Sequence, residues 1–131
     1  MRPLTAFLCA AVLLGQTASG RSPKPAAPVY DRATTIDIAG VIAELRDTPT
    51  GALPGLHLLV ATEKKGDVDV YVGPGPFVKD FGFKFTRGEE VRATGSKTRC
   101  ETGEVVLARE IRRHDVTVYL RDIDGKPLWT Q

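Results

Sequence analysis

Two short runs of alternating apolar residues lie close together in the middle of the chain. Their apolar positions are Leu56, Leu58, Val60, Val68, Val70 and Val72. Alternation with a period of two places such side chains on one face of a β-strand. The polar segment 63–67 between the runs contains Gly66, which tolerates the positive φ of a tight reversal. The pattern predicts a β-hairpin with one apolar face. Because an isolated hairpin is only marginally stable in water, further strands must cover that face.

Four more segments have the composition of strands. They are residues 34–45, 90–96, 104–111 and 116–122. The first contains Gly40, and a glycine inside a long strand marks a bulge or bend by which one strand serves two sides of a small barrel. Residues 46–55, with two prolines and two glycines, are predicted to form a loop, and the polar residues 97–103 a turn.

A short helix is predicted after the hairpin. The segment 73–76 reads Gly-Pro-Gly-Pro and ends the strand ladder, because proline donates no backbone hydrogen bond. Pro76 suits the first position of a helix, and Gly82 suits its end. Phe77 and Phe81 are four residues apart and share one helix face. We expect them to close one end of a barrel.

The order of these elements predicts an all-β fold: a small OB-fold-like Greek-key barrel with one short helix between strands three and four and an appended C-terminal β-hairpin. Tyr119 and Trp129, near the C-terminus, are expected to cover a sheet edge. An up-and-down or SH3-like barrel also fits the number of strands. The helix position and the glycine of the first strand favour the OB-fold.

The N-terminal residues have a different character. Residues 1–20 combine a basic start, an apolar run from Leu4 to Leu14 and a small-residue end, which is typical of a cleaved signal peptide. Residues 21–33 contain three prolines and predict a flexible linker, so the barrel domain is expected over residues 34–131. The leader predicts a periplasmic or secreted protein without a transmembrane segment after cleavage.

The chain has 18 Lys and Arg against 16 Asp and Glu, and one of the basic residues, Arg2, belongs to the leader. The mature chain is therefore close to neutral and has no strong basic field for nucleic acid. Cys9 also lies in the leader, which leaves Cys100 without an intrachain partner. Cys100 is then a buried thiol, an intermolecular disulfide or a redox-sensitive site, and the buried thiol is the simplest of the three.

OB-folds commonly bind ligands on the face of strands two and three and on two flanking loops. On this hairpin, the candidate ligand-binding residues are His57, Asp69 and Tyr71, expected on its outward side. The flanking loops add Arg46 on one side and Lys97 and Arg99 on the other. His57 beside Asp69 indicates a surface pair across the hairpin.

No metal-ligand spacing, nucleophile motif or cofactor motif accompanies these candidate residues. We therefore expect no catalytic residues, no metal and no cofactor, and we expect that the protein is not an enzyme. A single-strand binder requires several exposed aromatic residues along a basic groove, and the face offers Tyr71 alone among interleaved acids and bases. Nucleic-acid binding, to single-stranded DNA or another oligonucleotide, is thus the alternative hypothesis.

Five segments carry a resemblance. They read IDIAGVIAEL, LHLLVAT, DVDVYVGPGPFV, GEEVRATGS and VLAREI, and the chain closes with YLRDIDGKPLW. A first strand ending in Gly-x-Ile and a fourth strand reading Gly-Glu-x-Val-x-Ala-x-Gly resemble the small exported bacterial OB-fold proteins, some of which are described as DNA-binding. The resemblance covers residues 34–129. It implies an exported fold that binds a ligand or partner.

Together these features predict an exported, non-enzymatic OB-fold binding module of the periplasm or cell envelope. Its partner is expected to be an envelope protein or a small ligand, held on the hairpin face and the two loops. The alternative is a nucleic-acid-binding protein that uses the same barrel face.

Overall fold

The computed structural model describes residues 27–82 and 84–130. The predicted leader, residues 1–20, and residues 21–26 of the predicted linker lie outside the described residues. The described strands are β1 (Thr35–Thr48), β2 (Gly55–Thr62), β3 (Gly66–Gly73), β4 (Glu90–Cys100), β5 (Gly103–Arg113) and β6 (Val116–Tyr119). The described helices are the 3₁₀ turn η2 (Arg32–Thr34), α1 (Gly75–Asp80) and the 3₁₀ turn η3 (Leu128–Thr130). No helix in this part of the chain is long and apolar enough to cross a membrane.

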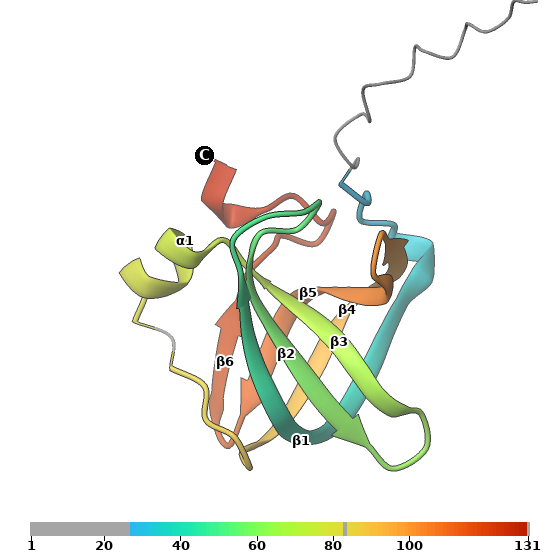
Figure 1. Cartoon of the computed structure of the whole chain (residues 1–131), viewed down its shortest axis with the longest axis vertical. Coiled ribbons are helices and arrows are strands. Elements are labelled where there is room, and N and C mark those ends of the chain that lie inside the picture. The colour runs from blue at the N-terminus through green and yellow to red at the C-terminus, as the bar shows by residue number, and fades with distance from the viewer. Residues whose placement is uncertain (1–26, 83, 131) are drawn as a thin grey trace, which may run out of the picture.

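Five strands close into a barrel (Figure 1). The sheet order is β3-β2-β1-β4-β5-β6, and a parallel pairing of β3 with β5 closes the first five strands of this order into a ring. β5 shares one edge between two neighbours, since its middle pairs with β3 and its last four residues pair with β6. The predicted all-β, OB-fold-like barrel is thus confirmed, together with the short helix between β3 and β4 and the added C-terminal hairpin.

The bend of β1 makes the closure possible. Gly40 lies where β1 passes from β4 to β2, and it pairs with both Val91 and Thr62. A Cβ atom on Gly40 would stand 2.2 Å from the carbonyl oxygen of Ala61. Only glycine permits this approach of two backbones. The strand then bulges, with a register shift between residues 42 and 44. The predicted curl of the first strand is confirmed, although the bulge follows the glycine.

The apolar faces predicted for the hairpin form the centre of the barrel. Four of the six predicted positions are completely buried: Leu58, Val60, Val70 and Val72. The side chains of Leu56 and Val68 pack at the margin of the same cluster. Each fully buried aliphatic side chain contributes about 1.5–3 kcal/mol relative to exposure. The alternation in the sequence therefore predicted the inward face of the hairpin correctly.

The helix α1 closes one end of the barrel with one aromatic residue rather than two. Phe77 and Val78 are buried in the core cluster, whereas Phe81 is 62% exposed. The ring of Phe81 stacks outside that of Phe77, with centroids 4.8 Å apart. The helix ends at Asp80, so Phe81 is its C-cap and no longer faces the barrel. The expectation that both rings fill the barrel end is therefore wrong for Phe81.

Two segments predicted as loops are partly strands. β1 continues to Thr48, so Arg46 lies on a strand and not in the loop, which shortens to residues 49–54. β4 and β5 are separated by residues 101 and 102 alone, so Lys97 and Arg99 also lie on a strand. Both regions are polar because their strands face solvent on one side. In the sequence alone, a polar segment of a strand therefore cannot be distinguished from a turn.

The folded contacts begin before the predicted boundary at residue 34. The Asp31 backbone N–H donates to Ser96 Oγ at 3.0 Å, and the Asp31 side chain caps η2. Tyr30 packs its ring against the backbone of Gly125, near the other end of the chain. The end of the predicted linker is thus part of the domain.

Candidate functional site

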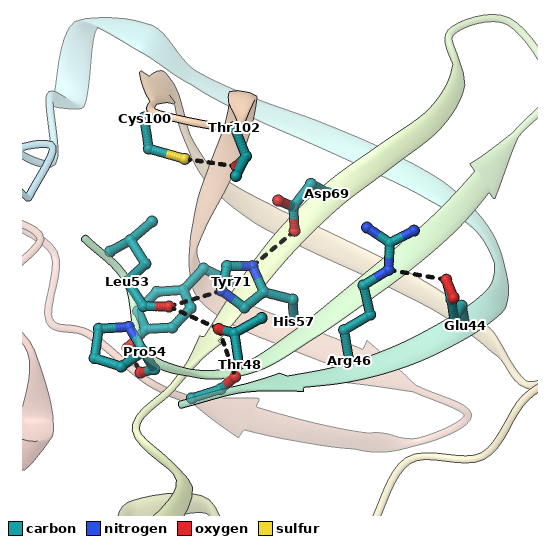
Figure 2. A network of polar contacts seen from close by, with 11 residues as sticks. Glu44, Arg46, Thr48, Leu53, Pro54, His57, Asp69, Tyr71, Cys100 and Thr102 are labelled. Atoms are coloured by element: carbon teal, nitrogen blue, oxygen red, sulfur yellow. Dashed lines mark hydrogen bonds and ion pairs between the residues drawn. The ribbon is translucent and has the colours of Figure 1, made fainter. Parts of the chain in front are cut away.

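His57 and Asp69 lie side by side on neighbouring strands, β2 and β3 (Figure 2). His57 Nδ1 is 2.9 Å from Asp69 Oδ1, and Nε2 is 2.8 Å from the carbonyl oxygen of Leu53. Both ring nitrogens face acceptors, so the arrangement favours the imidazolium, which donates from both. Burial by itself lowers the pKa of His57, but the hydrogen bonds to Asp69 and Leu53 outweigh it and raise that pKa above its ordinary value of 6.5.

The loop 49–54 folds over these side chains. Leu53 accepts from His57, and Pro54 accepts from the Tyr71 hydroxyl at 2.7 Å. Burial under the loop raises the pKa of Tyr71 to about 12. His57 is 8% exposed and Tyr71 is 4% exposed. The prediction of an open outward face is therefore wrong for these two residues, because the flanking loop covers them.

The turn between β4 and β5 holds the loop from the other side. Glu101 Oε2 accepts the Ala52 backbone N–H at 2.9 Å. This hydrogen bond is the main cause that lowers the pKa of the Glu101 carboxyl. Cys100, the last residue of β4, is half-buried beside this turn, and its Sγ lies 3.1 Å from Thr102 Oγ1. The two loops that flank the usual OB-fold binding face are therefore joined to each other.

A small cleft of about 110 Å³ opens between the two loops and the β2–β3 surface. We call its lining the loop face. It comprises Arg46, Thr48, residues 50–53, His57, Asp69 and residues 100–102. Segments separated by some fifty residues meet here, and each is fixed by a hydrogen bond to a neighbour. The cleft is thus shaped by the closed barrel rather than by any one motif.

A family model for the MamS/MamX magnetosome proteins matches residues 34–118 of the chain. The chain belongs to the MamS/MamX magnetosome protein family. The matched region runs from η2 into β6, so it contains the barrel and the whole loop face. No curated protein matches the chain. The resemblance to small exported OB-fold proteins stays a prediction beside this family membership.

Within the MamS/MamX domain, the structure brings only some of the predicted residues together. Arg46, His57 and Asp69 line the loop face, and Arg46 Nε bonds to Glu44 Oε1 at 2.9 Å. Lys97 is 3.5 Å from Glu104 and lines a separate hollow next to Asp69. Arg99 is exposed on β4 and lines neither space. The six predicted residues therefore do not form one site.

Tyr71 is turned toward a second, larger cleft on the other side of the loop. We call this space, of about 560 Å³, the aromatic cleft. Its walls include Tyr30, Tyr71, Trp129 and the buried side chain of Arg121. Trp129 was expected to cover a sheet edge; its ring packs against that of Phe77 in α1, with centroids 5.0 Å apart. No local pattern pointed to Tyr30 and Arg121, because the contact between them joins segments some ninety residues apart.

Proposed function

We propose that this protein is a binding module of the cell envelope or magnetosome, which holds a ligand or partner on its loop face without transforming it. Family membership supports the magnetosome context, and the predicted leader supports export. The fold supports binding, because OB-folds commonly recognise ligands through these two loops.

The observation that carries the proposal is the way in which the loop 49–54 is held. The hydrogen bonds that fix it include those of Ala52 with Glu101, of Leu53 with His57, and of Pro54 with Tyr71. A loop held before binding loses less conformational entropy when a partner arrives. Such preorganisation is the property expected of a recognition surface.

The state of His57 supports binding over catalysis. A general base must have a free nitrogen within hydrogen-bond reach of the proton that it removes. Here Nδ1 is engaged by Asp69 and Nε2 by the Leu53 carbonyl. The imidazole therefore acts as a structural link between the strands and the loop.

The loop face has few of the exposed aromatic and unpaired basic side chains that bind single-stranded nucleic acid. Stacking requires exposed aromatic rings, and Tyr71 is 4% exposed beneath the loop. Arg46 and Lys97 are each close to a carboxylate, of Glu44 and Glu104 respectively. We expect fluorescence titration with single-stranded oligonucleotides at two salt concentrations to give no salt-dependent binding at micromolar protein.

Site-specific photocrosslinking in cells tests the proposal. A benzoylphenylalanine at Thr50, which is exposed on the loop face, is expected to give a discrete adduct. The same group at Val116, which is 55% exposed on β6, serves as the matched control. Adding Glu101→Ala should reduce the Thr50 adduct by freeing the loop. Equal adducts from both positions, or none from Thr50, would overturn the proposal.

A further inference from the structure

Arg121 is a buried cation at the base of the aromatic cleft. It follows β6 and is 9% exposed. Its backbone bridges to Pro127, and its Nη1 donates to the carbonyl oxygen of Gly125 at 2.9 Å. The guanidinium carbon lies 5.1 Å from the centroid of the Trp129 ring and 5.8 Å from that of Tyr30. The side chain is thus held in place by a closed turn and two aromatic rings.

No carboxylate of the described residues forms an ion pair with Arg121. The nearby Asp124 bonds to Arg32 at 3.2 Å, and Asp122 accepts two backbone N–H groups of its own turn. A buried charge is costly unless it is paired and hydrogen-bonded. Cation–π contacts with two rings offset part of that cost. Arg121 is therefore buried without an anionic partner among the described residues.

One edge of the guanidinium is unused. Within the described residues, Nη1 makes the one hydrogen bond of this group, and Nε is buried without a partner. The Nε and Nη2 atoms form the edge that binds a carboxylate or phosphate side-on with two parallel hydrogen bonds. Among the described residues no group occupies this edge, and a planar or tetrahedral oxyanion is the partner that its geometry suits.

The space beside Arg121 fits a small organic molecule. The aromatic cleft measures about 560 Å³, and small-molecule sites commonly fall between about 300 and 1,000 Å³. Its aromatic walls are fixed independently: Tyr30 by the backbone of Gly125, Tyr71 by Pro54 and Trp129 by Phe77. Asp124 and Lys126 line the same cleft beside Arg121. Mainly apolar walls with a few charged groups are typical of a ligand site.

We propose that the aromatic cleft binds a small organic oxyanion, a carboxylate or phosphate monoester carried on an apolar body, and that Arg121 is its anion-binding residue. Arg121, Tyr30 and Trp129 all lie outside the part matched by the family model, residues 34–118. The site is separate from the loop face, so its test and that of the proposed function succeed or fail independently.

Nuclear magnetic resonance of the full chain tests the site directly. The Nε–Hε signal of Arg121 is followed while benzoate or phenyl phosphate is added. A saturable downfield shift of this signal is expected with at least one of the two, and their relative affinities identify the preferred oxyanion. Benzamide, which is neutral, should leave the signal in place. Inorganic phosphate should bind more weakly than phenyl phosphate, because it lacks the apolar body.

Variants of Arg121 provide a second test of the same site. Arg121→Gln should abolish the binding, and Arg121→Lys should weaken it by about tenfold or more, because an ammonium cannot form the side-on pair. Arg112→Gln, at an exposed arginine of β5, should bind as the unmodified protein does. The proposal is overturned if the Arg121 signal does not respond, or if benzamide shifts it equally. The titration of the unmodified protein needs no variant, so it tests the proposal even if Arg121→Gln does not fold.

Discussion

The carboxylate of Glu101 accepts the backbone N–H of Ala52 at 2.9 Å and so joins the β4–β5 turn to the β1–β2 loop. Both residues line the loop-face cleft. The contact is exposed, and its importance lies in the position of the loop rather than in the stability of the barrel. Its loss should therefore appear as local motion.

We predict that Glu101→Ala increases amide hydrogen exchange at residues 50–53 while the urea midpoint of the whole domain changes little. Exposed contacts of this kind contribute little to global stability. Glu104→Ala, at an exposed acid of β5, is the control, and the loop should keep its protection there. Unchanged exchange at Ala52 in Glu101→Ala would show that the loop is held by other contacts.

The pH dependence of stability should depend on His57. Its pKa is higher in the folded state than the ordinary value of 6.5, so its contribution is fully present below that value and is lost as the pH rises through the folded pKa. We predict that the melting temperature falls as the pH rises from about 6 toward 8 and beyond.

Two variants isolate this effect. Asp69→Asn removes the carboxylate charge that helps to raise the pKa of His57, so the fall in melting temperature should shrink. His114→Gln, at the exposed histidine of the β5–β6 turn, should keep the pH dependence of the unmodified protein. If His114→Gln removed the dependence and Asp69→Asn retained it, His57 would not be its source.

Gly40 should not tolerate a side chain. In Gly40→Ala the new Cβ would meet the Ala61 carbonyl oxygen at 2.2 Å, and the neighbour is backbone that cannot rotate away. We expect a loss of about 1–3 kcal/mol or more in the free energy of unfolding, measured by urea denaturation. Gly75→Ala has no atom within 4 Å of the new Cβ and should be neutral or slightly stabilising.

Phe77 and Phe81 should differ sharply on truncation. Phe77 is 8% exposed, and Phe77→Ala is expected to cost about 3–5 kcal/mol of unfolding free energy, as for other buried aromatic residues. Phe81 is 62% exposed and stacks on Phe77, so Phe81→Ala should cost about 0.5–1.5 kcal/mol. Comparable losses in both variants would place Phe81 in the core after all.

Much of the fold follows from local patterns. Alternation placed Leu58 and Val70 on the buried side, and the Gly-Pro pairs ended β3 and began α1. Gly40 marked the bend of the first strand. These features depend on a few consecutive residues, so the sequence is sufficient to predict them. The same reasoning failed at Lys97 and Arg46, where the solvent-facing part of a strand reads as a loop.

The sequence by itself determined the strands, the bend, the position of the helix and the pairing of His57 with Asp69 across the hairpin. Only the tertiary structure decided which side chains are covered and which spaces stay open. The loop face exists because Ala52 meets Glu101, and the aromatic cleft exists because Tyr30 meets Gly125. Both contacts join segments that are far apart in the chain and that lie together only in the folded barrel, so no local pattern encodes them.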